Sequence, residues 1–159
     1  MDILGAFDYL EEIERSIEAM YLSFSQAFSS DIESAALFRE MAEDENEHLA
    51  IVQYQRRIIL KNKQSFIDVE IDLGEIAEVI EKAKNGAKMS KDLSLDEALK
   101  ISIDVERSSA EHHYKTIMSK ANPAFSEMVN HLGSADEMHK GRLEKFLGER
   151  YFNTKDLLD

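Results

Sequence analysis

Residues 41–48 read MAEDENEH, and residues 136–139 read DEMH. In each stretch an acidic residue stands three positions before a histidine, Glu45 before His48 and Asp136 before His139. Side chains three residues apart are neighbours on one face of an α-helix, so each pair would present a carboxylate beside an imidazole. In a chain this rich in acids, roughly one such pair is expected by chance. The pairs therefore gain meaning only from the apolar residues around them.

The first pair belongs to a predicted helical hairpin. A first helix, running to about residue 29, has an apolar face formed by Phe7, Leu10, Ile17, Tyr21, Phe24 and Phe28. Glu14 lies in the middle of this face. After a turn capped by Asp31, a second helix is predicted to about residue 63, with an inward face formed by Phe38, Met41, Val52 and Ile59. Glu45 and His48 occupy the two positions of this inward helical face that have no apolar residue.

The second pair belongs to a similar predicted hairpin. A capping box at Ser94 begins a third helix, whose inward face is formed by Leu95, Leu99, Ser102, Ser109, His113 and Ile117. Glu106 lies within that face. Asn122 and Pro123 begin a fourth helix, with an inward face formed by Phe125, Val129, Leu132, Leu143 and Phe146. Asp136 and His139 fill the gap in this last face.

Residues 64–91 connect the two hairpins as a long crossover. We expect a short helix there from Gly74 to Lys84, with a stop at Asn85 and Gly86. A connection of this length permits the second and third helices to run parallel. The predicted fold class is therefore all-α, a four-helix bundle with one long crossover, and we expect a single domain over residues 1–159.

The polar residues at these inward steps form a repeat. The two halves match at offsets of 92, 91 and 91 residues, and the matching sets are Glu14, Glu45 and His48, and Glu106, Asp136 and His139. Within each hairpin the two acids lie at about equal distances from the turn, which brings side chains of antiparallel helices to the same height. Two acids and one histidine from each hairpin are thus predicted to meet near the middle of the bundle.

A pair of metal ions would explain why four acids face the core. An unpaired carboxylate in a dry interior is destabilising or becomes neutral, so these acids need a common partner. Carboxylates can bridge two divalent cations, and neutral imidazoles complete the coordination. A purely structural explanation would need several buried Arg or Lys residues on the same faces, which contain none there. The alternative is that some faces turn outward, so that their acids are solvated as we expect for Glu11, Glu12, Glu43 and Asp44.

Composition excludes several classes of function. The formal charge of -13 argues against binding to nucleic acid or to an anionic membrane, because both require clustered Lys and Arg. No run of about 18 uncharged apolar residues is present, so we expect a soluble, cytoplasmic protein. The chain has no cysteine, which leaves His, Asp and Glu as its strong metal ligands. Electrons for any redox chemistry would then come from another molecule.

The chain resembles the ferritin-like di-iron carboxylate proteins, and among them the rubrerythrin-like branch. The resemblance rests on Glu14 seven residues before Tyr21, followed by the Glu45 to His48 motif, and it extends over all four helices. It implies that Glu14 and Glu106 are terminal ligands, that Glu45 and Asp136 bridge, and that His48 and His139 are imidazole ligands. Tyr21 would hydrogen-bond a ligand. His113, at nearly the equivalent inward position of the other half, is a second candidate for this role or a core residue, whereas His112 and His131 are expected on the surface.

Three features depart from the family pattern. Asp136 stands where the family has Glu, so a symmetric bridge from the fourth helix is in doubt. Ser109 occupies the position where rubrerythrins carry an extra carboxylate linked to peroxide chemistry, which weakens the inference of peroxidase activity. The chain has no Cys-x-x-Cys pair, so we expect the bundle alone, without a rubredoxin-like domain.

The leading functional hypothesis is an oxidoreductase whose metal pair, iron by the resemblance and with Mn or Zn as alternatives, reduces hydrogen peroxide or dioxygen. A separate donor protein would re-reduce it. Two alternatives stay open: iron oxidation and storage, which would need a closed multi-subunit shell, and a non-catalytic helical protein with a structural metal. A homodimer is expected from the resemblance and from apolar residues outside the inward faces, namely Ile13, Met20, Leu37 and Ile51.

Overall fold

The computed structural model describes residues 1–70, 73–108 and 119–155, with side chains placed for all of these except Asp136 and residues 151–155. Within these ranges the regular structure is entirely helical, which confirms the predicted all-α fold class. The elements are α1 (Ile3–Ala27), α2 (Ile32–Lys61), η1 (Lys63–Ser65), α3 (Leu73–Met89), α4 (Leu95–Glu106), η2 (Pro123–Phe125) and α6 (Ser126–Lys155).

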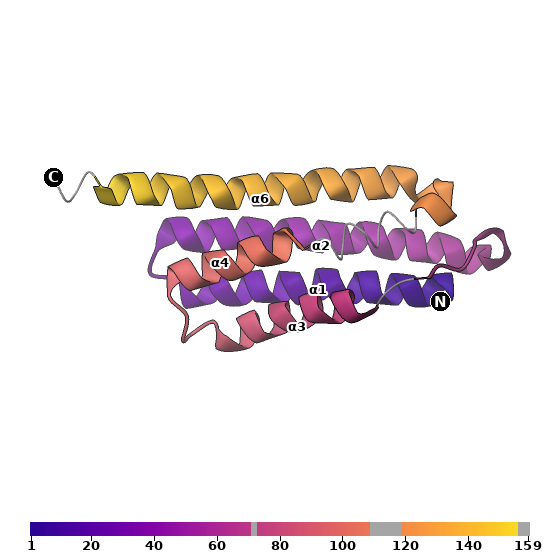
Figure 1. Cartoon of the computed structure of the whole chain (residues 1–159), viewed down its shortest axis with the longest axis horizontal. Coiled ribbons are helices and arrows are strands. Elements are labelled where there is room, and N and C mark those ends of the chain that lie inside the picture. The colour runs from indigo at the N-terminus through magenta and orange to yellow at the C-terminus, as the bar shows by residue number, and fades with distance from the viewer. Residues whose placement is uncertain (71–72, 109–118, 156–159) are drawn as a thin grey trace.

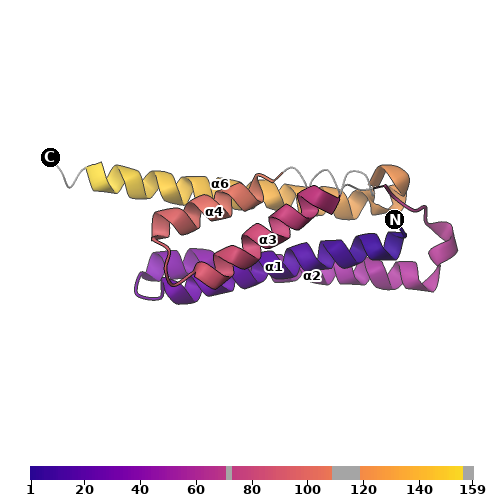
Figure 2. The same cartoon turned by 60° about the horizontal axis from the view of Figure 1, so that its bottom comes forward.

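The helices lie roughly along one axis (Figures 1 and 2). In Figure 1, α1 and α6 run in one direction, and α2 and α4 run in the opposite direction. The chain between the end of α2 and the start of α4 returns along the length of the bundle, and α3 lies in this connection. This all-helical arrangement is consistent with a ferritin-like bundle.

The α1–α2 hairpin forms as its sequence predicts. Asp31 caps α2 by accepting a hydrogen bond from the backbone N–H of Ser34 at 3.2 Å. The predicted inward residues of both helices are buried except for Phe28, which is partly buried just beyond the end of α1. The rings of Phe24 and Phe38 pack edge to face with centroids 5.2 Å apart near the turn. Both helices therefore present their apolar stripe, with its polar interruptions, to the interior of the bundle.

Helix α3 packs against α1, and Gly86 lies at the closest approach. A Cβ atom at this position would lie 3.2 Å from Met20 Sδ and 3.3 Å from Ile101 Cγ2, so any other residue would require these side chains to shift by a few tenths of an ångström. The predicted stop at Asn85 and Gly86 is wrong, because α3 continues through both residues to Met89. Gly86, which in the local sequence indicates the end of a helix, here lies inside a helix at a packing contact with its neighbours.

Burial within the chain removes most of the sequence support for a dimer. Ile13 and Met20 are fully buried and Leu37 is 7% exposed, so these three side chains already have partners in their own chain. Ile51 is partly buried. The homodimer stays a prediction that rests on the family resemblance.

The second half begins as predicted but differs in two details. Ser94 and Glu97 form a capping box at the start of α4, but the helix ends at Glu106 with Arg107 as its C-cap, which is earlier than predicted. The predicted inward residues Ser109, His113 and Ile117 lie outside the described residues, as does His112. Asn122 does not cap the fourth helix with its side chain. It accepts a hydrogen bond from Ile67 N–H at 2.7 Å and donates one to Ile67 O at 2.9 Å, which ties the crossover to the last hairpin.

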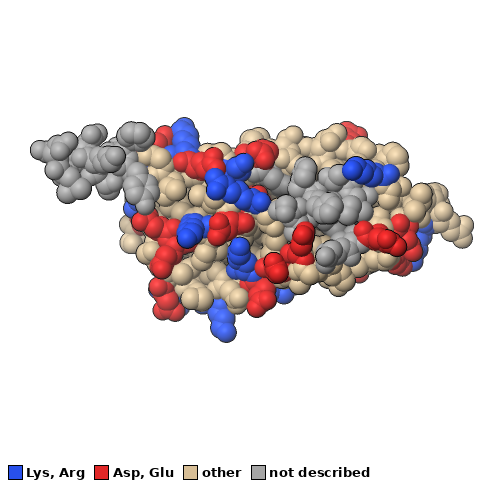
Figure 3. Space-filling view, in the orientation of Figure 1, with Lys and Arg blue, Asp and Glu red and all other residues tan. Residues whose placement is uncertain are grey.

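The outer surface carries charged side chains of both signs (Figure 3). Lys and Arg side chains are interspersed with Asp and Glu side chains on the face seen in Figure 3. Among the described helices, none combines the length and the apolar character that crossing a membrane requires.

Candidate metal centre

Five of the six predicted ligands have described side chains, and these five lie together in the interior. Glu14 comes from α1, Glu45 and His48 from α2, Glu106 from the last residue of α4, and His139 from α6. Each of these side chains is at most 5% exposed. Asp136 lies in α6 one turn before His139, but its side chain is outside the described part.

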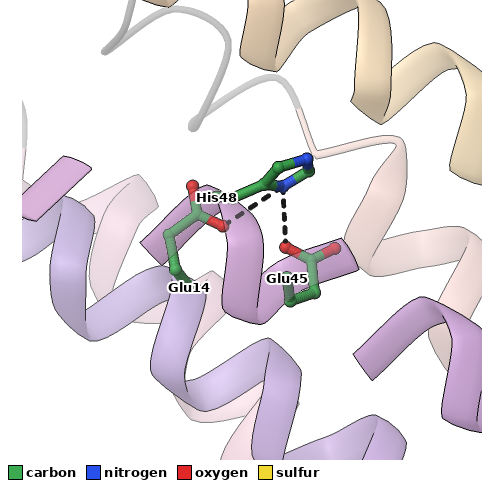
Figure 4. A group of neighbouring side chains, drawn as sticks. All are labelled: Glu14, Glu45 and His48. Carbon is green, nitrogen blue, oxygen red and sulfur yellow. Dashed lines mark hydrogen bonds and ion pairs between the residues drawn. The ribbon is translucent and has the colours of Figure 1, made fainter. Parts of the chain in front are cut away.

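The first group contains Glu14, Glu45 and His48, each of which offers a ligand atom within 4.8 Å of the others. His48 Nδ1 lies 3.2 Å from Glu45 Oε2 and 3.6 Å from Glu14 Oε2. Figure 4 shows the two carboxylates converging on this ring nitrogen from neighbouring helices. The helical spacing of three residues places Glu45 beside His48, and the register of the hairpin brings Glu14 to the same level.

The second group contains Glu45, Glu106 and His139, again with ligand atoms within 4.8 Å of one another. His139 Nδ1 lies 3.0 Å from Glu45 Oε1 and 3.6 Å from Glu106 Oε2. Despite these close oxygens, Nδ1 has no hydrogen bond of acceptable geometry among the described residues. The ring nitrogen and the two carboxylates thus face a common point without satisfying one another.

Glu45 belongs to both groups and lies between the two imidazoles. Its Oε2 faces His48 and its Oε1 faces His139. The two rings are nearly parallel, with centroids 5.3 Å apart and an interplanar angle of 23°. A carboxylate with one oxygen turned toward each half has the position that a bridging ligand would need.

Electrostatics tie the protonation of the histidines to these carboxylates. Burial alone would lower the pKa of His48, but the carboxylates of Glu14 and Glu45 raise it to about 10. Burial alone would likewise lower the pKa of His139, but the carboxylates of Glu106 and Glu45 raise it to about 11. Burial would also raise the pKa of Glu45, but the adjacent imidazoles of His139 and His48 hold that pKa below its ordinary value. Without metal, both imidazoles are therefore protonated at neutral pH and offset part of the carboxylate charge.

This donor set suits a pair of divalent cations. Carboxylate oxygens and imidazole nitrogens are the ligands that iron, manganese and zinc accept, and the described interior places them in two groups with one shared member. A cation in each group would replace the imidazole proton as the positive charge and would give Nδ1 of His139 the partner that it lacks. The individual ligand roles stay predictions.

Tyr21 holds one of these carboxylates. Its hydroxyl donates a hydrogen bond to Glu106 Oε1 at 2.6 Å, so Tyr21 in the first half positions an acid of the second half. Burial and the negative charges of Glu106 and Glu45 raise the pKa of Tyr21 well above its ordinary value, which keeps the hydroxyl protonated as a donor.

The surface position predicted for His131 is confirmed.

Asp44 and Arg142 lie next to the centre, and sequence reasoning missed both. Asp44 was expected to be solvated, but its Oδ2 lies 3.2 Å from His139 Nε2 and accepts a hydrogen bond from Arg142 Nη1 at 3.0 Å. The expectation was only partly right, because α6 packs against α2 on this side of the helix and leaves the Asp44 side chain 35% exposed. A signal was present in the sequence, since Arg142 stands three residues after His139 and so shares its helical face.

Comparison with known proteins agrees with this geometry. A family model described as Rubrerythrin matches residues 11–147. No curated protein and no solved structure gives a significant match to the chain. The matched range includes all the acids and histidines of the two groups, together with Tyr21, Asp44 and Arg142. The chain belongs to the rubrerythrin family, whose members are built on the ferritin-like di-iron carboxylate domain.

Proposed function

We propose that this protein is a di-iron oxidoreductase that reduces hydrogen peroxide or dioxygen with electrons from a separate donor protein. The observation that carries the proposal is the shared carboxylate of Glu45 between two buried groups, each completed by one more acid and one histidine. A single structural cation would need only one such group. Two groups joined by a common acid favour a pair of metals that react as a unit.

In this proposal Glu14 and Glu106 are terminal ligands, Glu45 bridges with Asp136, and His48 and His139 supply the imidazoles. The bound iron pair would supply two electrons, which with two protons convert one hydrogen peroxide into two waters while each Fe(II) becomes Fe(III). The donor protein then returns two electrons.

The surrounding residues would keep this chemistry in a fixed and dry place. Tyr21 orients Glu106 by its short hydrogen bond, and the burial of all five described ligands excludes bulk water from their carboxylates. In such a low-dielectric site, charges and dipoles act more strongly than in water. Each turnover consumes two electrons, so an external reductant is necessary for more than one turnover.

Anaerobic loading with Fe(II) followed by peroxide tests the proposal. We expect two Fe(II) per chain and oxidation of both by one equivalent of hydrogen peroxide, read from the ferric absorption and from the residual peroxide. Elemental analysis of protein purified without added metal identifies the metal that the protein acquires in the cell. Protein that binds two Fe(II) but leaves them reduced in the presence of both peroxide and dioxygen would refute the redox function.

The same titration separates the proposal from iron storage. A storage protein keeps oxidising and retaining iron when Fe(II) is added in large excess, whereas the proposed enzyme stops at two per chain. A storage role would also require a closed shell of many subunits, which the native mass would reveal.

A further inference from the structure

Asp44 and Arg142 support one half of the metal centre and not the other. The outer ring nitrogen of His139, Nε2, lies 3.2 Å from Asp44 Oδ2, and Arg142 donates to that same oxygen at 3.0 Å. Asp44 comes from α2 and the other two residues from α6, so the contact also bridges two helices. With Nε2 engaged in this way, the ring is held with Nδ1 toward Glu45 and Glu106.

His48 has no corresponding support. Its Nδ1 faces Glu45 and Glu14, but no described residue forms a hydrogen bond with its Nε2. The repeat explains the difference, because the offset of 91 residues that relates His48 to His139 also relates Asp44 to Ala135 and Ile51 to Arg142. Neither Ala135 nor Ile51 can offer a carboxylate or a guanidinium. The repeat-equivalent positions of the second hairpin therefore do not give His48 the support that Asp44 and Arg142 give His139.

We propose that Asp44, held by Arg142, makes the Glu45, Glu106 and His139 group the tighter of the two metal positions, so that the centre fills in sequence. This inference rests on the proposed two-metal function. A carboxylate that accepts the outer N–H of a ligating imidazole fixes the ring and makes its inner nitrogen a better donor, and loss of such a partner commonly weakens metal binding by about 10- to 100-fold. The His139 group has this advantage and the His48 group lacks it.

Titration of the apoprotein with Co(II) under calorimetry tests the order of filling. Wild-type protein should bind two Co(II) in two resolved phases. In Asp44→Ala the tighter phase should weaken by about 10- to 100-fold while the weaker phase stays within a few-fold of the wild type. Glu43→Ala is the matched control, because Glu43 is an exposed acid on the same turn and its removal changes the net charge equally.

Arg142→Met separates a positioning role from simple charge. Removal of a nearby positive charge should tighten the binding of cations if long-range charge dominates. If Arg142 instead holds Asp44 in place, the variant should weaken the tighter phase and leave the weaker one unchanged. The two explanations thus predict opposite signs, and this variant keeps the test valid if Asp44→Ala fails to fold.

The outcomes distinguish this inference from the proposed function. Two equal binding phases in the wild type, or equal changes of both phases in Asp44→Ala, would overturn the inference while leaving the two-metal centre intact. A fall in the apoprotein melting temperature with unchanged Co(II) affinities would show Asp44 to be a helix bridge only, which also overturns it. If the wild type binds no metal, the proposed function itself fails.

Discussion

The two halves of the repeat carry matching acids and histidines but hold them differently. In the first hairpin, Glu14, Glu45 and His48 project from the interiors of α1 and α2, which are 25 and 30 residues long. In the second, the described part of α4 has 12 residues, and Glu106 is its last. The repeat has thus kept a 30-residue helix, α6, for Asp136 and His139, but it carries Glu106 at the end of a much shorter helix.

Several contacts that position the second half come from the first, although Arg107 at the end of α4 also donates to Glu144 of α6 at 2.6 Å. Tyr21 on α1 donates to Glu106, and Asp44 on α2 accepts from His139. Arg150 near the end of α6 reaches back to Asp31 at the turn of the first hairpin, at 2.7 Å. We infer that the first hairpin acts as the template on which the second half of the centre is assembled. The predictions below challenge this asymmetry, beginning with the largest expected effect.

Removal of Glu45 should affect both halves at once. Because Glu45 contributes one oxygen to each group, Glu45→Ala should reduce the metal content from two ions per chain to at most one, as measured by elemental analysis of matched preparations. Glu47→Ala is the control, since Glu47 is exposed on the same helix and removes the same charge. Equal metal content in wild type and Glu45→Ala would leave the shared-carboxylate interpretation without support.

The stability of the apoprotein should fall as the pH rises. The pKa values of His48 and His139 in the folded chain, about 10 and about 11, lie above the ordinary value of 6.5. The resulting stabilisation is fully present below about pH 6.5 and is lost as the pH rises through these folded-state values. Between about pH 7 and pH 9 the free energy of unfolding should decrease by up to about 1.4 kcal/mol per pH unit for each histidine.

Urea denaturation at several pH values would measure this slope and compare the halves. A decrease in the free energy of unfolding per pH unit that matches two titrating histidines would show that both are protonated in the folded apoprotein. Half that decrease would restrict the effect to the histidine of one hairpin. The free energy of unfolding of the metal-loaded protein should be nearly constant over the same pH interval, because bound cations have replaced the protons. An apoprotein whose stability rises between pH 7 and pH 9 would contradict the assigned charge state.

Helix α3 packs mainly against α1 of the first hairpin and also contacts α4, and Gly86 tests the tightness of this packing. Gly86→Val would place a branched side chain against Met20 and Ile101, where even a Cβ atom is crowded. Overpacking of this kind costs about 1–3 kcal/mol in the free energy of unfolding. Asn85→Val is the matched control, because it introduces the same β-branched residue at an exposed position of the same helix. Similar denaturation midpoints for the two variants would show that α3 adjusts without cost.

Local sequence determined much of this structure. The helical spacing of apolar residues located the bundle helices, and the offsets between Glu14, Glu45 and His48 and their counterparts indicated which polar residues would meet. The capping box at Ser94 was also readable, because both of its partners lie within one helical turn.

Features that depend on contacts between helices could not be read from the sequence. Gly86 resembles a helix stop locally and is retained in the helix because Met20 and Ile101 approach it. Asp44 looks like one of several solvated acids until α6 covers it. Asn122 has the sequence of a helix cap, yet its side chain is used by the backbone of Ile67. In each case the deciding partner lies far away in the chain.

The smallest expected effect concerns the start of α4. The Ser94 hydroxyl accepts a hydrogen bond from Glu97 N–H at 3.3 Å, and Glu97 accepts one from Ser94 N–H at 2.8 Å. Ser94→Ala should therefore lower the free energy of unfolding by about 1 kcal/mol. Ser23→Ala, inside α1 near its C-terminal end, is the comparison in the first hairpin. It should be nearly neutral, because alanine has the higher helix propensity and the Ser23 hydroxyl only donates to the carbonyl of Ala19.

Amide hydrogen exchange would show which residues lose protection in Ser94→Ala. If the second half depends on the first for its order, faster exchange should be confined to the first turn of α4, while Glu106 at the other end keeps its bond to Tyr21 and the metal content stays at two. If α4 instead orders the second half by itself, the loss of its cap should spread to Glu106 and weaken metal binding there. The second result would end the view of the first hairpin as the template, because a defect at the start of α4 would then control a ligand that Tyr21 was inferred to hold.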